Sequence, residues 1–210
     1  MDIRRAYTNW SATYDSDGNL TRDLDALITR NSLTQGHYAS ILELACGTGK
    51  NTPLLSQIGE RVYANDFSEG MIAQARAKLN QGNVSFSISD LTRPWPFASA
   101  SFDLVACNLV LEHISDLAPI FAEATRVLRA SGCFFISELH PFRQYRGAQA
   151  TFSRDDEATK IPAYVHNISD FLNAAEGAGL ALAILKEWWH EEDQHGLPRL
   201  VSFTFENALI

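Results

Sequence analysis

Short apolar runs alternate with stretches of helical periodicity between residues 41 and 139. The runs have the length of buried strands, and polar or glycine-containing turns bound them. They predict strands at 41–46, 61–66, 84–88, 102–108 and 133–139. Because helical segments separate these strands, the pattern predicts an α/β fold with a parallel sheet and helices on both of its faces.

Two flanking regions extend this predicted core. Residues 2–35 predict two helical stretches around a loop of turn-forming residues at 14–19, with apolar faces made of Ile3, Ala6 and Tyr7 and of Leu24, Leu27 and Ile28. Towards the C-terminus, we expect Ser169 to cap a further helix. Strand runs at 180–189 and 199–205 then predict a closing hairpin.

The first predicted strand ends at a glycine-containing turn. Gly47 and Gly49 follow the apolar run 41–46 at once, and a helical pattern begins after them. Because glycine has no Cβ, such a turn can take unusual φ angles and let a ribose or an adenosine lie against the backbone. A plain connection between a strand and a helix fits the turn as well, so the sequence downstream decides between the two.

Acidic residues end the next two strands. The parallel sheet places Asp66 beside the glycine turn, where its carboxylate can accept hydrogen bonds from both hydroxyls of a ribose. The alternative role for Asp66, capping the next helix, is one that Ser68 can fill. Asp90 follows the third strand and can bind an adenine amino group, and a turn-forming role fits it almost as well in isolation.

Five segments in fixed order carry a family resemblance: 43–49, 66–71, 90–91, 102–114 and 127–132. Together they resemble the successive motifs of class I S-adenosylmethionine-dependent methyltransferases, in the small-molecule, type-11-like group, over residues 38–140. The resemblance implies a doubly wound, Rossmann-like sheet of seven strands, mostly parallel, with an antiparallel C-terminal hairpin. It also implies in-line methyl transfer from S-adenosyl-L-methionine to a small-molecule acceptor, with S-adenosyl-L-homocysteine as product.

Two other functions stay open at this point. A nicotinamide-dependent oxidoreductase shares the first motif, but the third glycine that its dinucleotide-binding turn needs near Thr52 is missing from the sequence. A protein of the methyltransferase fold can also bind the cofactor or a partner without catalysis.

Composition fits one globular domain over residues 1–210. Within it we expect an N-terminal helical lid at 1–35, a cofactor-binding core at 36–140, a substrate-side insertion at 141–167, and a helix with a hairpin at 168–210. The net charge of −8, without a basic cluster, argues against nucleic acid or an anionic membrane as a partner. We expect a cytoplasmic monomer or homodimer without a metal, because Cys46, Cys107 and Cys133 lack metal-ligand spacing.

The resemblance implies a cofactor site along the carboxyl ends of the strands. The expected contacts are Glu43, Ala45, Gly47 and Gly49 at the amino-acid end, Asp66 and Phe67 at the ribose, Asp90 and Leu91 at the adenine, and in addition Met71, Asn108 and Leu109. Phe67 and Leu91 would enclose the adenine ring, although ordinary core packing explains both residues as well.

The carboxylate of the cofactor needs a cation, and Arg22 is the candidate. A guanidinium pairs bidentately with a carboxylate, and related small-molecule methyltransferases carry an N-terminal Arg and Tyr in comparable places. Tyr14 and Trp10 are the aromatic residues that we expect to close over the sulfonium. The alternatives are a solvated helix surface for Arg22 and anchoring of the first helix for Trp10.

His113 and His140 are the candidate catalytic residues. They follow the fourth and the fifth strand, at the sheet edge where ligands gather in open α/β folds. A histidine near the acceptor can remove a proton at neutral pH. A carboxylate acceptor needs no base, so contact with the acceptor without proton transfer is the alternative.

The insertion at 141–167 brings together aromatic and cationic residues: Phe142, Arg143, Tyr145, Arg146, Phe152 and Tyr164. Additions to a shared fold often set specificity, so we expect this segment to form a substrate wall or lid. Its two arginines favour an anionic acceptor, unless the acidic run 155–157 neutralises them.

Overall fold

A seven-stranded sheet with strand order β3-β2-β1-β4-β5-β9-β8 forms the centre of the molecule. The computed structural model describes residues 2–154, 157–194 and 196–207. The strands of the sheet are β1 (Ile41–Leu44), β2 (Val62–Asp66), β3 (Val84–Ile88), β4 (Phe102–Asn108), β5 (Leu128–Leu139), β8 (Leu180–Trp188) and β9 (Leu200–Asn207). β1 to β5 are parallel, whereas β9 is antiparallel to β5 and β8. The predicted parallel sheet and closing hairpin are therefore confirmed.

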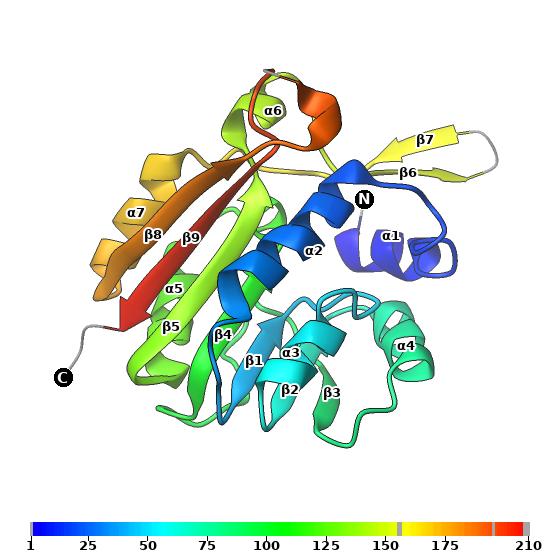
Figure 1. Ribbon diagram of the computed structural model, residues 1–210. Coiled ribbons are helices and arrows are strands. Elements are labelled where there is room, and N and C mark those ends of the chain that lie inside the picture. The colour runs from blue at the N-terminus through cyan, green and yellow to red at the C-terminus, as the bar shows by residue number, and fades with distance from the viewer. Residues whose placement is uncertain (1, 155–156, 195, 208–210) are drawn as a thin grey trace.

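Helices cover both faces of this sheet (Figure 1). One face carries α2 (Leu20–Leu33), α3 (Thr52–Ile58) and α4 (Glu69–Lys78), and the other carries α5 (Ala118–Val127) and α7 (Ile168–Gly177). Residues of β1 alternate between the two cores: Leu42 and Leu44 pack with α5, and Ile41 packs with α2 and α3. Burial on both faces is the reason why β1 reads as an unbroken apolar run.

Two details of the helices differ from the prediction. Asn167, rather than Ser169, is the N-cap of α7, and its backbone N–H donates to Asp170 Oδ2. The predicted apolar face of α2 is narrower than expected, because Leu24 and Ile28 are buried while Leu27 is 52% exposed.

The N-terminal helix and the insertion meet beyond the carboxyl ends of the strands (Figure 1). α1 (Ile3–Trp10) packs Ala6 and Trp10 against Ile161. The insertion contains α6 (Pro141–Tyr145) and a separate hairpin of β6 (Thr151–Arg154) and β7 (Glu157–Lys160), and two short 3-10 turns lie at η1 (Leu111–His113) and η2 (Glu191–Asp193). Among the described residues, no helix is both long and apolar enough to cross a lipid bilayer.

Candidate functional site

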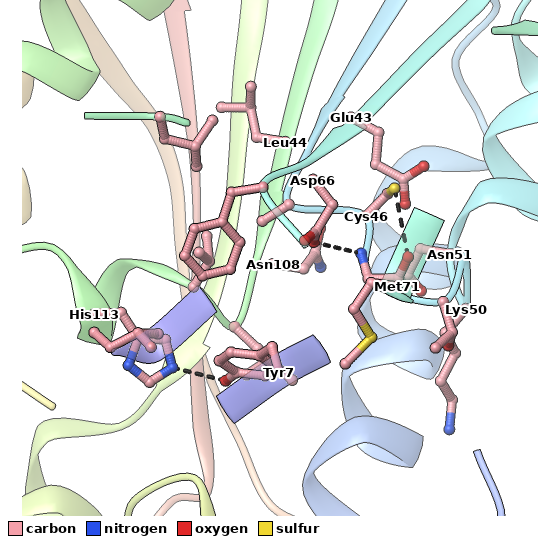
Figure 2. A pocket seen from close by; sticks show the side chains of 18 of the residues that line it. Tyr7, Glu43, Leu44, Cys46, Lys50, Asn51, Asp66, Met71, Asn108 and His113 are labelled. Carbon is pink, nitrogen blue, oxygen red and sulfur yellow. Dashed lines mark hydrogen bonds between the residues drawn. The ribbon is translucent and has the colours of Figure 1, made fainter. Parts of the chain in front are cut away.

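A cavity of about 230 Å³ opens where β1, β2 and β4 end. Its walls include most of the predicted site residues: Tyr14, Arg22, Glu43, Ala45, Gly47, Asp66, Phe67, Met71, Asp90, Leu91, Asn108, Leu109 and His113. Figure 2 shows Asp66 near the middle of this group, with Tyr7 and His113 on one side and Lys50 and Asn51 on another. Three predicted site residues, Trp10, Gly49 and His140, are not part of this lining.

The turns after β1 and β4 have left-handed backbone at the cavity wall. Ala45 has φ 50°, Gly47 φ 57° and Leu109 φ 52°. Such angles strain residues that carry a Cβ, and strain of this kind is concentrated at functional sites. A Cβ on Gly47 would meet no atom within 4 Å, so the wall beside Gly47 is open space. A Cβ on Gly49, in contrast, would lie 2.7 Å from Leu79 Cδ1, so that glycine serves packing against the end of α4.

Asp66 is fixed at the end of β2 by two backbone donors. Its Oδ2 accepts from the Gly47 N–H at 3.0 Å, and its Oδ1 accepts from the Ser68 N–H at 2.8 Å. Burial raises the pKa of Asp66 to about 6, so the carboxylate is ionised at neutral pH. Since each carboxylate oxygen can accept a second hydrogen bond, Asp66 can receive two further donors from the cavity.

Two further acidic residues of the lining, Glu43 and Asp25, are also buried. Glu43 Oε2 accepts from Thr52 Oγ1 at 2.6 Å, and burial raises the pKa of Glu43 to about 8. Asp25 on α2 accepts from Asn51 Nδ2 at 2.9 Å and from Asn108 Nδ2 at 2.8 Å. Sequence reasoning missed Asp25, although a carboxylate next to Leu24 on the apolar face of α2 was an available signal.

Arg22 is a buried cation rather than a solvated one. It is 8% exposed, and its guanidinium donates to the carbonyl oxygens of Tyr14 and Asp17. The Tyr14 ring lies 4.0 Å from its Cζ. Its Nε is buried without a hydrogen-bond partner in the described structure. The charge of Arg22 is therefore held at the cavity wall by neutral groups, which suits an anionic ligand group.

Trp10 packs against Tyr7 and Tyr14, the two tyrosines of the cavity wall, without lining the cavity itself. Its ring contacts Tyr14 at a centroid distance of 4.7 Å and Tyr7 at 5.9 Å, and its Nε1 donates to Asp17 Oδ2. Because Trp10 is buried and does not line the cavity, it positions the two tyrosines that do.

The two candidate histidines have different surroundings. His113 lines the cavity, where its Nε2 lies 2.7 Å from the Tyr7 hydroxyl. His140 is fully buried, caps α6 by accepting the Phe142 N–H at Nδ1, and its Nε2 lies 2.8 Å from Glu187 Oε1. Both nitrogens of His140 are thus used in joining β5, α6 and β8. The structure therefore corrects the assignment of His140 as a catalytic residue, because its side chain never reaches the cavity.

The arginines of the insertion do not mark an acceptor site. Arg143 donates to Asp193 Oδ1 and to the Leu197 carbonyl oxygen. Arg146 is exposed, and none of the described residues of 141–167 lines the cavity. Asp155 and Asp156, which the sequence offered as neutralising partners, lie outside the described residues.

Comparison with known proteins identifies the family. Residues 42–136 match the family described as a methyltransferase domain. The chain belongs to the class I S-adenosylmethionine-dependent methyltransferases. An uncharacterized methyltransferase of Emericella nidulans is 27% identical over 88% of this chain and 78% of its own length. The predicted family, and S-adenosyl-L-methionine as its cofactor, are thereby confirmed.

Two further relatives bear on how far the likeness extends. A malonyl-[acyl-carrier protein] O-methyltransferase of Legionella pneumophila is 27% identical over 82% of this chain. The match between the two covers only 62% of the length of the Legionella protein. The solved DhpI–SAH complex superposes with a TM-score of 0.75 over 96% of this chain and 93% of DhpI, at 22% identity, which shows the shared fold.

Several lining residues of this methyltransferase were not predicted from the sequence. They are Ile3, Tyr7, Asp25, Leu44, Cys46, Thr48, Lys50, Asn51, Ser89, Thr92, Val110 and Ile114. Most of them neighbour a predicted residue along the chain and extend the same turn. Tyr7 and Asp25 are different, because they come from helices whose position over the strand ends is set by tertiary contacts.

Proposed function

We propose that this methyltransferase transfers the methyl group of S-adenosylmethionine to a small-molecule acceptor. The observation that carries the proposal is that one cavity collects a fixed carboxylate, Asp66, a buried cation, Arg22, and an aromatic wall. When bound, S-adenosylmethionine supplies an electrophilic methyl group on a positively charged sulfur.

The residues present fit this cofactor. Asp66 accepts the two ribose hydroxyls with the lone pairs that Gly47 and Ser68 leave free. Arg22, which lines the cavity, pairs with the carboxylate of the amino-acid end. Phe67 and Leu91 flank the adenine, and Asp90 accepts from its amino group.

The chain contributes alignment and exclusion of water more than covalent chemistry. Orientation of two reactants alone supplies on the order of 7–11 kcal/mol of barrier reduction. Two hydrogen bonds join α1 to the core over the cavity. One connects the Tyr7 hydroxyl with His113 Nε2, and the other connects Thr8 Oγ1 with Ser68 Oγ. A lid of this kind excludes water and closes the site once ligands have entered.

Thermal-shift measurements with S-adenosylhomocysteine and with NAD(H) test cofactor choice. A ligand at a hundredfold excess over its Kd stabilises the protein by about 2.7 kcal/mol. We expect S-adenosylhomocysteine to raise the Tm and NAD(H) to leave it unchanged. The opposite result would support the nicotinamide-dependent alternative.

Turnover with a labelled methyl donor over a panel of metabolites tests catalysis. We expect label to pass to at least one small molecule. Binding of S-adenosylhomocysteine without transfer to any acceptor would favour the other alternative, a protein that binds the cofactor and does not catalyse.

A further inference from the structure

Three groups form a hydrogen-bonded chain at one side of the cavity. The Tyr7 hydroxyl lies 2.7 Å from His113 Nε2, and His113 Nδ1 lies 2.8 Å from the Pro162 carbonyl oxygen (Figure 2 shows the first of these bonds). A carbonyl oxygen only accepts, so Nδ1 carries the proton and donates it to Pro162. In the neutral imidazole, Nε2 is then the acceptor, and the Tyr7 hydroxyl donates to it.

This arrangement decides how a proton can reach His113. Both ring nitrogens are already engaged, one with Pro162 and the other with Tyr7. The Tyr7 oxygen still has lone pairs, and Tyr7 lines the cavity. A proton that leaves a molecule in the cavity therefore reaches His113 Nε2 through the Tyr7 oxygen.

Burial keeps Tyr7 and His113 neutral at rest, and the carboxyl group of Glu112 lies beside them. Burial lowers the pKa of His113 and raises the pKa of Tyr7 well above its usual range. Glu112 Oε1 lies 3.8 Å from His113 Nε2, and Glu112 Oε2 is buried without a hydrogen-bond partner in the described structure. Burial raises the pKa of Glu112 to about 7, so Glu112 is partly ionised at neutral pH and its carboxylate form can balance an imidazolium at His113.

The cations of the cavity wall lie elsewhere in the site. Among the described lining residues, the arginine is Arg22 and the lysine is Lys50. Arg22 is bonded to backbone of the loop after α1, and Lys50 forms an ion pair with Asp23 at 2.5 Å. Beside Tyr7 the lining consists of His113 and Phe67, and Arg4 lies outside the lining with its Cζ 5.7 Å from the Phe67 ring. A lining without a cation at this place suits an uncharged acceptor better than a carboxylate.

We propose that Tyr7 is a catalytic residue that takes the proton of the acceptor while it passes its own proton to His113, and that the acceptor is a hydroxyl or an amine rather than a carboxylate. This inference rests on the proposed function. The acceptor oxygen or nitrogen forms the new bond to the methyl carbon, and the carbon–sulfur bond breaks with its electron pair left on sulfur. The acceptor proton moves to the Tyr7 oxygen, the Tyr7 proton moves to Nε2, and the imidazolium later returns one proton to water.

The first test compares Tyr7→Phe with a matched control, Tyr63→Phe. Tyr63 packs against Phe97 and Phe102 in the core, away from the cavity, so its hydroxyl has no part in the reaction. Turnover is measured over phenols, alcohols, primary amines and carboxylates, including a malonyl thioester. We expect transfer to a hydroxyl or amine compound, and a fall in kcat of about 100-fold or more in Tyr7→Phe. We expect Tyr63→Phe to leave the affinity for S-adenosylhomocysteine unchanged, and Tyr7→Phe to lower it by no more than about 10-fold, well below the effect on kcat.

The pH profile separates a proton path from a structural contact. We expect kcat of the wild type to fall at acid pH as His113 becomes protonated, and this limb to disappear in His113→Gln. The titratable groups that face the pair are Tyr14, Asp66, Glu112 and Glu138. Burial raises the pKa of Glu112 to about 7 and that of Glu138 to about 8, so both carboxyls hold a proton over part of the same pH range.

A second readout needs no turnover. Nitrogen NMR of the imidazoles, in protein saturated with S-adenosylhomocysteine, reports the tautomer and the pKa of His113. We expect the Nδ1–H form with a pKa below its ordinary value, and a changed Nε2 signal in Tyr7→Phe but not in Tyr63→Phe.

Three results would overturn the inference. Transfer to a carboxylate with an unchanged rate in Tyr7→Phe would leave the proposed function intact and exclude the proton path. An Nε2–H tautomer would exclude the path by itself. Binding of S-adenosylhomocysteine without turnover on any compound class would overturn the proposed function and this inference together.

Discussion

The floor and the roof of the cavity are held in different ways. The floor is the set of turns after β1, β2 and β4, and backbone bonds fix it: Glu43 is in register with Ala64 of β2 and Ala106 of β4. The roof is α1 with the loop that follows it, and side chains fix it. Burial and strand pairing fix the floor, whereas the bonds that join the roof to the core run between side chains far apart in the sequence, such as Thr8 with Ser68 and Tyr7 with His113.

The roof contacts are few and partly exposed. Thr8 Oγ1 meets Ser68 Oγ at 2.9 Å, and Asp15 accepts from Thr48 Oγ1 and from Lys78 Nζ, both at 2.6 Å. The Lys78–Asp15 pair is 40% and 45% exposed, and a pair of this kind contributes about 0–1 kcal/mol. From this comparison we propose that the roof, and not the floor, is the part that opens when a ligand enters or leaves.

The largest effect is expected from breaking the floor at Asp66. Asp66→Ala removes the acceptor for two hydroxyls, so that S-adenosylhomocysteine should bind about 2–3 kcal/mol more weakly, or about 30- to 150-fold, by calorimetric titration. The same change leaves the Gly47 and Ser68 N–H groups without their carboxylate, which should also lower the free energy of unfolding by roughly 1–3 kcal/mol.

The pKa of Asp66 sharpens this test. Since burial raises that pKa to about 6, affinity of the wild type for S-adenosylhomocysteine should fall as the pH drops below 6. Asp66→Ala should lose this dependence. An Asp66→Ala protein that folds and binds with wild-type affinity would show that the ribose lies elsewhere.

A smaller effect is expected from displacing the roof without touching the cavity. A Cβ on Gly70 of α4 would lie 2.6 Å from Ser11 Oγ and 3.0 Å from the Thr8 carbonyl oxygen. Gly70→Ala should therefore move α1 away and break the Thr8–Ser68 bond, and affinity for S-adenosylhomocysteine should fall by up to about 10-fold. Stability should change little, because alanine favours the helix by about 1 kcal/mol over glycine.

Hydrogen exchange measures the roof directly. We expect exchange over residues 3–22 to be slower with S-adenosylhomocysteine than without it in the wild type, and faster in Gly70→Ala than in the wild type. Gly82→Ala is the control, since a Cβ there would meet no atom within 4 Å. Equal exchange with and without ligand would mean that the N-terminal region is scaffold rather than a lid.

A separate effect, on stability rather than on binding, concerns the carboxyl group of Glu43, which is buried in the floor. Burial raises the pKa of Glu43 to about 8 from its usual 4.5, so the folded protein keeps a proton that the unfolded chain has lost. The stability that Glu43 contributes is therefore complete below about pH 4.5 and is lost as the pH rises through 8. Glu43→Gln cannot ionise, and its Tm should fall less than that of the wild type between pH 5 and pH 9.

The pKa difference between 4.5 and about 8 corresponds to about 4–5 kcal/mol, so the difference in Tm should be on the order of 10 °C, at about 2–4 °C per kcal/mol in a protein of this size. Glu60→Gln, at an exposed position, is the matched control and should follow the wild type. Parallel melting curves for Glu43→Gln and the wild type would mean that Glu43 is already ionised in the folded protein.

The failures of sequence reasoning follow the same division of floor and roof. Asp66 and Asn108 were predicted because each ends a strand, and Gly47 because it lies in the turn after one; parallel strands end at one edge of the sheet. His140 also follows a strand, but it turns to Glu187 of β8 and caps α6. Position at a strand end places a residue near the site, and neighbours added later in the chain decide where its side chain points.

The sequence by itself determined the sheet, the glycine turn, the acidic strand ends and the family, because these depend on local periodicity and on motifs at fixed spacing. Only the tertiary structure decided that Tyr7 meets His113, that Asp25 holds Asn108, and that Trp10 stands behind two tyrosines. The physical reason is that Tyr7 and Asp25 meet partners 106 and 83 residues away along the chain, and contacts of this kind leave no periodic signal, since only folding brings the partners together.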